Sequence, residues 1–160
     1  MTDRFKPIAK ELRDLINQWE PRLRELDKET RTGQRNSQER TVKQILGHMV
    51  DSATNNTHRI IHLQNLNCHL NYPDYASKGN NDKWIAIQRY QEEEWDLVVD
   101  LWASTNRHVA HVIEQVNEGK LDRTWVTALK EEITLEEMIT DFPRHFRLHL
   151  SEIEELINQA

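Results

Sequence analysis

The sequence predicts an all-α protein, a four-helix bundle formed by one domain of residues 1–160. Glycine and proline number only four each, and charged residues make up 30% of the chain, which favours long helices over a turn-rich β-sandwich. The apolar residues, 37% of the total, recur every three or four positions in four long segments. Four amphipathic helices with one long connection in the middle of the chain are typical of a helix bundle.

The first predicted helix starts near Phe5 and carries an apolar stripe as far as Trp19. Proline lacks the N–H that an interior helix residue donates, so we expect a break or a kink at Pro21, followed by a further helical piece. The polar segment 31–38 is predicted to be a connection.

A capping box marks the start of the second helix. Thr41 and Gln44 have the spacing at which each side chain reaches the other residue's backbone N–H, and an apolar stripe follows to about Asn67. The segment 68–82 contains a proline, a glycine and three asparagines and is predicted to be a long loop. Connections of that length without secondary structure are uncommon and often form a lid or a binding element.

The third helix is predicted to run from Trp84 to near Gly119. Trp84, Trp95 and Trp102 recur at helical spacing, which places them in the core rather than on a stacking surface. Asn106 projects from the same stripe and is expected to need an internal hydrogen-bond partner.

A second capping box, Thr134 with Glu137, starts the last helix. Its core face is predicted to consist of Leu135, Met138, Ile139, Phe142, Phe146, Ile153, Leu156 and Ile157. Pro143 falls inside this periodic run.

Charge, hydropathy and cysteine content together bear on the partners and the location of the protein. The net charge is −6 and the pI is about 5.7, so the sequence has no basic surface for nucleic acid. It has no apolar stretch long enough to span a membrane and no signal-peptide pattern at its N-terminus. Cys68 is the single cysteine, which rules out an intrachain disulfide. We therefore expect a cytoplasmic protein in a reducing environment, with no nucleic-acid or membrane partner.

His145 and His149 are the strongest candidates for metal ligands. They are four residues apart in the last helix, which puts both imidazoles on one side of it. A third ligand from another helix would complete a His₃ set with open positions for water or substrate, the arrangement that a catalytic divalent ion needs. Helical periodicity places His149 within the core face and His145 at its edge. The alternative is a core histidine hydrogen-bonded to backbone beside a solvated one.

Periodicity alone predicts that His48 lies on a polar outer face, together with Asp51 and Asn55. If His48 bound a metal, Asp51 could fix the tautomer of its imidazole. The other helically spaced histidine pairs point away from the apolar stripes and are expected to be solvated; they are His58 with His62 and His108 with His111.

Two segments resemble the DinB-like superfamily, and more narrowly the YfiT-like group of metal-dependent hydrolases and thiol S-transferases. The first is Thr41-Val-Lys-Gln-Ile-Leu-Gly-His48-Met-Val-Asp51-Ser-Ala-Thr-Asn55-Asn56, which resembles the signature of the family's second helix. The second is Phe142-Pro-Arg-His145-Phe-Arg-Leu-His149, where the family carries a His-x-x-x-His pair. One departure is Arg40, because the family often has tryptophan before the Ser/Thr cap.

The resemblance implies an up-down-down-up bundle in which His48, His145 and His149 hold a divalent ion, contrary to the periodicity of His48. Family members bind zinc, nickel or similar ions, and His₃ sites also accept iron or manganese. Many members form homodimers. The resemblance leaves Asp51 two roles, as an orienting partner of His48 or as a catalytic base.

Three functions follow from the resemblance, and the sequence does not separate them. The first expectation is a metal-dependent transferase that acts with a low-molecular-weight thiol such as bacillithiol, mycothiol or glutathione. The second is a metal-dependent hydrolase that uses a metal-bound water. The third is a non-catalytic metal-binding or interaction bundle.

Overall fold

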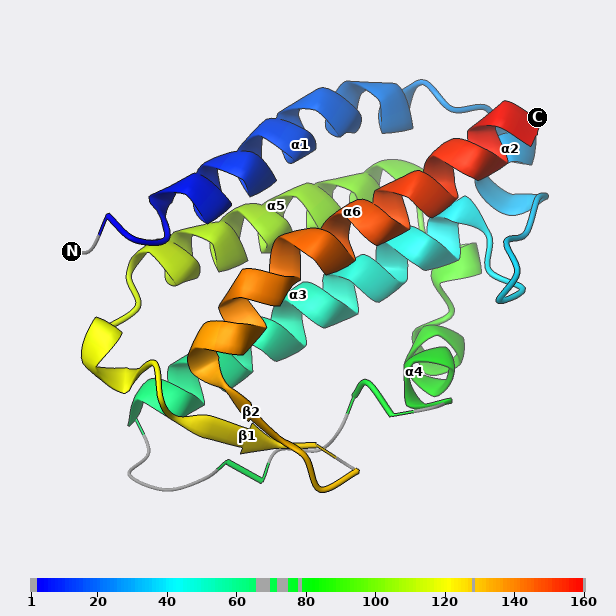
Figure 1. Ribbon diagram of the computed structural model, residues 1–160. Coiled ribbons are helices and arrows are strands. Elements are labelled where there is room, and N and C mark those ends of the chain that lie inside the picture. Colours follow the sequence, from blue (N-terminus) through cyan, green and yellow to red (C-terminus); the bar gives the residue numbers. More distant parts are fainter. Residues whose placement is uncertain (1–2, 66–69, 72–74, 78, 128, 160) are drawn as a thin grey trace.

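Four long helices form a bundle in the computed structural model, which describes residues 3–65, 70–71, 75–77, 79–127 and 129–159 (Figure 1). They are α1 (Lys6–Arg24), α3 (Val42–Asn65), α5 (Trp95–Glu114) and α6 (Leu135–Gln159). α1 and α6 run in one direction and α3 and α5 in the other, which confirms the up-down-down-up order. α1 packs against α5, α5 against α3, α3 against α6 and α6 against α1. None of the described helices is both long and apolar enough to cross a membrane.

The apolar stripes of the four helices meet in one core. Trp102 of α5 is fully buried, and its ring stacks on Phe146 of α6 with centroids 5.9 Å apart. Both predicted capping boxes are present. The Thr41 N–H donates to Gln44 Oε1 over 3.0 Å, and the Thr134 N–H donates to Glu137 Oε2 over 2.8 Å. The starts of α3 and α6 are therefore set by local sequence.

The predicted break at Pro21 is wrong, because α1 continues through it to Arg24. Pro21 and Asn17, whose carbonyl loses its helical donor, are both exposed, so water can satisfy that carbonyl. Trp19 and Leu23 on either side remain buried in the core. A further short helix, α2 (Lys28–Thr32), occupies the start of the predicted connection and is capped by Asp27.

The predicted third helix is two helices. α4 (Asn80–Gln88) ends at Arg89, whose φ of 54° is left-handed, and a 3₁₀ turn, η1 (Tyr90–Glu92), leads to α5. Trp84 therefore lies on α4, where 40% of it is exposed, and its predicted core position is wrong. Trp95 and Trp102 are buried as predicted.

Gly47 explains how the chain returns to the bundle after α4. A Cβ atom at this position would lie 2.2 Å from the ring of Tyr90, so only glycine lets Tyr90 pack against α3. Tyr90 is buried against α3 at this position. Gly47 directly precedes His48 in that helix.

A two-stranded antiparallel hairpin precedes α6 and was not predicted. β1 (Thr124–Val126) pairs with β2 (Glu132–Thr134), and Trp125 lies opposite Ile133. Leu70 adds a bridge to Trp125 from the segment that follows α3. Strands of three residues are too short to produce a clear alternating pattern in the sequence.

Candidate metal site and adjoining cavity

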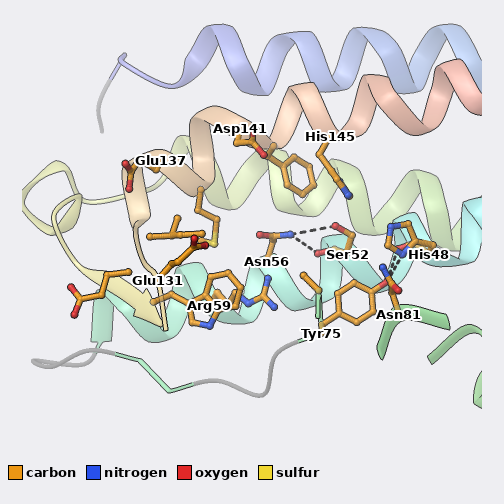
Figure 2. Close-up of a pocket in the computed structure, with 16 residues that line it drawn as sticks. His48, Ser52, Asn56, Arg59, Tyr75, Asn81, Glu131, Glu137, Asp141 and His145 are labelled. Carbon is orange, nitrogen blue, oxygen red and sulfur yellow. Dashed lines mark hydrogen bonds between the residues drawn. The ribbon is translucent and has the colours of Figure 1, made fainter. Parts of the chain in front are cut away.

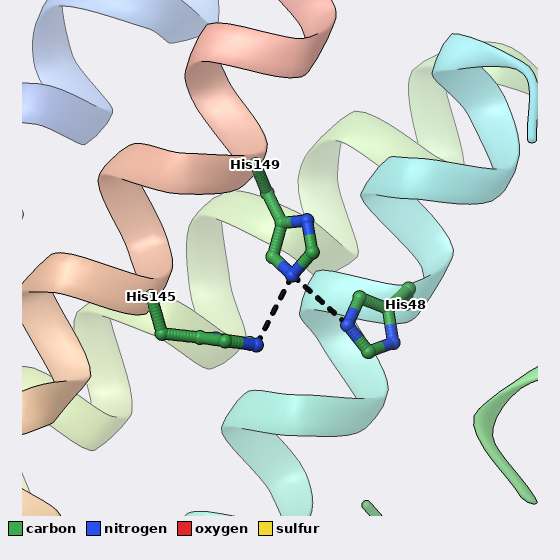
Figure 3. Close-up of side chains that lie close together, drawn as sticks. All are labelled: His48, His145 and His149. Atoms are coloured by element: carbon green, nitrogen blue, oxygen red, sulfur yellow. Dashed lines mark hydrogen bonds between the residues drawn. The ribbon is translucent and has the colours of Figure 1, made fainter. Parts of the chain in front are cut away.

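Three histidines from α3 and α6 converge at their Nε2 atoms (Figure 3). His149 Nε2 lies 3.0 Å from His48 Nε2 and 3.1 Å from His145 Nε2. The rings of His48 and His145 each stand nearly perpendicular to that of His149, at 82° and 87°. Among the described residues, this is the one group of three or more potential ligands close enough together to hold a metal ion.

His48 is 3% exposed, so the outer face predicted for it from periodicity is wrong. Helix α3 packs against α5 and α6 on one side and against α4 and η1 on the other. Its polar side, including His48, Asp51 and Asn55, is therefore buried as well. An apolar stripe shows which side of a helix packs in the core. It does not show whether other segments of the chain also cover the polar side of that helix.

The outer nitrogens of two of these imidazoles have defined partners. The Tyr75 hydroxyl oxygen lies 2.5 Å from His48 Nδ1 and 3.2 Å from the His48 backbone carbonyl. His149 Nδ1–H donates to Glu152 Oε2 over 2.8 Å, because a carboxylate can only accept. In the neutral form of His149 the proton therefore sits on Nδ1, and its Nε2 carries a bare lone pair that faces the Nε2 atoms of His48 and His145.

A cation bound by the three Nε2 atoms would use this lone pair together with those of His48 and His145. Metal–imidazole bonds are about 2.0–2.1 Å long, so two nitrogens bound to one ion lie roughly 3 Å apart, close to the distances from His149 Nε2 to the Nε2 atoms of His48 and His145. Burial, together with the neighbouring histidines and Arg40, lowers the pKa of His48 to about 2. Burial also lowers the pKa of His145 to about 4. The imidazoles of His48 and His145 are thus neutral near pH 7, the state that a metal requires. The residues fit a divalent ion.

Asp51 lies beneath this site without a described contact to His48. Its Oδ1 accepts hydrogen bonds from Tyr90 Oη at 2.8 Å and Gln88 Nε2 at 2.7 Å. Burial raises the pKa of Asp51 to about 6, although both hydrogen bonds oppose the shift. The predicted orientation of His48 by Asp51 is not what the structure shows, because Tyr75 occupies Nδ1. Tyr75 was missed since it lies in a segment with no periodic signal; Glu152, three residues after His149, was detectable from spacing.

A cavity of about 720 Å³ opens directly beside the histidines (Figure 2). It reaches His48 and His145 at one end and the β1–β2 hairpin at the other. The residues that line it are His48, Ser52, Asn56, Arg59, Tyr75, Ala76, Asn81, Trp125, Glu131, Glu132, Ile133, Glu137, Met138, Asp141, Phe142 and His145. Tyr75, Ala76 and Asn81 belong to the segment predicted to be a lid. They form part of the wall, and movement of that segment stays a prediction.

The remaining histidines behave as predicted where the structure describes them, since both other helical pairs are exposed. Cys68 lies outside the described residues. Asn106 is fully buried and donates from Nδ2 to the Trp102 carbonyl over 2.8 Å, which is the internal partner expected. Arg40, which departs from the family pattern, is 5% exposed and pairs with Asp82 at 2.7 Å, so it ties α4 to the start of α3.

No protein-family model matches this sequence, and neither does any curated protein sequence. The structure, by contrast, matches YfiT from Bacillus subtilis, described as a probable metal-dependent hydrolase with an unusual four-helix bundle topology. The match has a TM-score of 0.82 and covers 99% of this chain and 89% of that one. The chain has a YfiT-like fold.

The YfiT-like fold confirms, at the level of architecture, the resemblance predicted from the two histidine motifs. Sequence identity over the match is 16%, which establishes the fold alone. What this chain does with a YfiT-like fold has to be argued from its own side chains.

Proposed function

We propose that this protein is a metal-dependent enzyme in which His48, His145 and His149 hold a divalent ion at the end of the cavity. The observation that carries the proposal is the convergence of the three Nε2 atoms, with that of His149 lying 3.0 Å from His48 and 3.1 Å from His145. The similarity in fold to YfiT, a probable metal-dependent hydrolase, supports it.

When bound, a divalent ion at this position would lower the pKa of a coordinated water or thiol and so supply a nucleophile near neutral pH. The protein's own groups prepare the site. Hydrogen bonds at Nδ1 with Tyr75 and Glu152 orient the imidazoles of His48 and His149, so that their Nε2 atoms lie 3.0 Å apart. Burial raises the pKa of Tyr75 above its ordinary value, so its hydroxyl keeps the proton it donates to the His48 carbonyl. Asp51 is not among the lining residues of the cavity, and we assign it no proton transfer.

Hydrolysis by an activated water is the reaction we favour, because the fold is similar to that of a probable hydrolase. Transfer to or from a low-molecular-weight thiol is the second candidate. It is favoured by the cavity volume, about 720 Å³, which leaves room for a co-substrate beside the substrate. Turnover that needs metal and no thiol would identify the hydrolase, and turnover that needs both would identify the transferase. Metal binding without turnover of any substrate, with or without a thiol, would favour the third function, a non-catalytic metal-binding or interaction bundle. The homodimer and the cytoplasmic location stay predictions.

Metal content decides the first step. Untagged wild-type protein, His145→Ala and the control His111→Ala are compared by elemental analysis after reconstitution with zinc or nickel. His111 is exposed and lies far from the triad in sequence, so it tests non-specific uptake by imidazole. About one equivalent in the wild type and the control, with almost none in His145→Ala, is expected. Equal uptake by all three, with helicity retained by circular dichroism, would refute the site.

A further inference from the structure

Ser52 presents a hydroxyl group to the cavity from α3. It is 6% exposed, lines the cavity, and follows His48 by one helical turn, so the two side chains share a face of α3. Figure 2 shows Ser52 between Asn56 and the histidine end of the cavity. Within the described part of the chain, its hydroxyl oxygen accepts from Asn56 Nδ2 at 3.4 Å and its O–H has no acceptor. Buried hydroxyl groups are normally hydrogen-bonded, so this O–H is a donor for a ligand in the cavity.

Asn56, one turn further along α3, supplies the complementary acceptor. Its Nδ2 donates to the Ser52 backbone carbonyl over 2.8 Å. A carbonyl oxygen can only accept, so this contact fixes which end of the Asn56 carboxamide is the nitrogen. Oδ1 therefore points away from Ser52, as Figure 2 shows, and it receives no hydrogen bond from any residue that the structure describes. The α3 wall of the cavity thus offers one donor and one acceptor on neighbouring turns.

A donor beside an acceptor matches an amide group that has its C=O and its N–H on the same edge. Primary amides and lactams have this edge, whereas the usual trans amide directs the two groups in opposite directions. An ester or a carboxylate offers acceptors alone, so neither can pair with Asn56 Oδ1. A ligand that leaves a polar group of the site unpaired binds less tightly, so the two residues can select for an amide.

The other lining residues favour an uncharged ligand with an apolar body. Phe142 and Met138 of α6 and Ile133 of β2 contribute carbon groups that can cover such a body. The described lining residues also carry four carboxylates against one arginine, and all four acids are exposed; they are Glu131, Glu132, Glu137 and Asp141. This excess of negative charge repels an anion. Exposed carboxylates stay hydrated, so they offset little of the cost of desolvating a cation.

We propose that the cavity binds a primary amide or a lactam with an apolar body. The carbonyl oxygen of this ligand accepts from the Ser52 hydroxyl, and the N–H on the same edge donates to Asn56 Oδ1. Ser52 lies one helical turn from His48 and Asn56 lies about two turns from it, so the carbonyl is the end of the amide nearer the histidines.

The reaction that follows rests on the proposed hydrolysis, whereas the binding of the amide does not. In hydrolysis the oxygen of one water molecule bonds to the carbonyl carbon, and the C–N bond breaks. The nitrogen leaves with the electron pair of that bond and takes up a proton, which gives a carboxylic acid and an amine or ammonia. The acid ionises at neutral pH, and the acidic lining of the cavity then favours its release.

The test uses three probes that share one apolar body: 3-phenylpropanamide, methyl 3-phenylpropanoate and 3-phenylpropanoate. Their affinities for the metal-free protein are measured by isothermal titration calorimetry in the presence of a chelator. We expect the amide to bind about tenfold more tightly than the ester, and the carboxylate to bind most weakly. Equal binding of the amide and the ester, or tightest binding of the carboxylate, would overturn the proposal. Because no metal takes part, this result and the result of the metal-uptake experiment are independent, and the two proposals fail separately.

Variants assign the preference to the two residues. Ser52→Ala should weaken the amide and the ester by a similar factor, about three- to tenfold, because both lose the donor to their carbonyl. Asn56→Leu should weaken the amide alone and bring it to the affinity of the ester. Thr54→Val is the matched control, since Thr54 is exposed on α3 and its hydroxyl donates to the Val50 carbonyl. Equal affinities in Ser52→Ala and Thr54→Val would refute the role of Ser52. If Asn56→Leu is poorly folded by circular dichroism, the ranking of the three probes by the wild type still decides the proposal.

Discussion

His48 Nδ1 lies 2.5 Å from the hydroxyl oxygen of Tyr75, 27 residues further along the chain. The same hydroxyl donates to the His48 backbone carbonyl. Tyr75 thereby closes a loop of hydrogen bonds around one residue and turns the Nε2 of His48 toward α6. Its ring also meets Trp84 of α4 edge to face, with centroids 5.2 Å apart. Tyr75, which lies between α3 and α4, thus determines the orientation of His48, a predicted metal ligand on α3.

Tyr75→Phe should weaken metal binding with little effect on the fold. Phenylalanine keeps the contact with Trp84 and removes the hydrogen-bond partner of His48 Nδ1, so the imidazole loses the group that orients it. Loss of such an outer hydrogen bond lowers metal affinity by about 10- to 100-fold. Competition with a chromogenic chelator measures the affinity. Tyr90→Phe is the matched control, because Tyr90 contacts Asp51 and not the imidazoles; equal losses in both variants would contradict the role of Tyr75.

Glu152→Ala should have a similar effect through His149. The carboxylate accepts from His149 Nδ1 over 2.8 Å and raises the basicity of the inward nitrogen. We expect a loss of about tenfold or more in metal affinity, with a partial loss in Glu152→Gln, which keeps an acceptor without the charge. Glu155→Ala, three residues further on and exposed, serves as the control. A change no larger than that of the control would show that Glu152 does not support the site.

Asp51→Asn should change how stability depends on pH. Burial raises the folded-state pKa of Asp51 from 3.8 to about 6. Between these values the unfolded chain releases the proton and the folded protein retains it, so the free energy of unfolding falls as pH rises through this window. Below the window and above it the contribution is constant.

Urea unfolding gives the free energy of unfolding of the wild type and of Asp51→Asn at pH 4 and at pH 7.5. The effect is the change between the two pH values in the wild type minus the same change in the variant. The wild type should lose on the order of 1–3 kcal/mol relative to the variant between the two conditions. The other titrating groups, His48 among them, are present in both proteins and cancel. A difference between the two proteins that does not vary with pH would show that the carboxyl titrates normally.

Gly47→Ala should destabilise the fold. The added Cβ would meet the ring of Tyr90 at 2.2 Å, and Tyr90 cannot yield freely because its hydroxyl bonds to Asp51. Overpacking of this kind costs about 1–3 kcal/mol. Gly119→Ala is the control, since its Cβ would approach only the side-chain oxygen of Asn117, at 3.2 Å. Chemical unfolding that gave the same midpoint for both variants would refute the tight approach.

Local sequence was sufficient for the features that depend on neighbouring residues. The capping boxes at Thr41 and Thr134 placed the starts of two helices, because cap and backbone lie within one turn of each other. The four-residue spacing of His145 and His149 predicted that their imidazoles share one side of α6, for the same reason. The bundle class followed from the number of amphipathic segments, and the helix order from the resemblance.

The groups that lie against the second face of α3 come from segments distant in the sequence. Periodicity detects the apolar side of a helix, and His48 is on the polar side, which α4, η1 and the segment around Tyr75 cover. The exposure of Trp84 and the stacking of Arg59 on Trp125 have the same origin. These contacts join residues far apart in the chain, and no local pattern encodes a partner dozens of residues away. Neighbouring residues thus fix the starts of α3 and α6 and place two candidate ligands on one side of α6, while the packing of distant segments buries the third histidine and forms the cavity beside it.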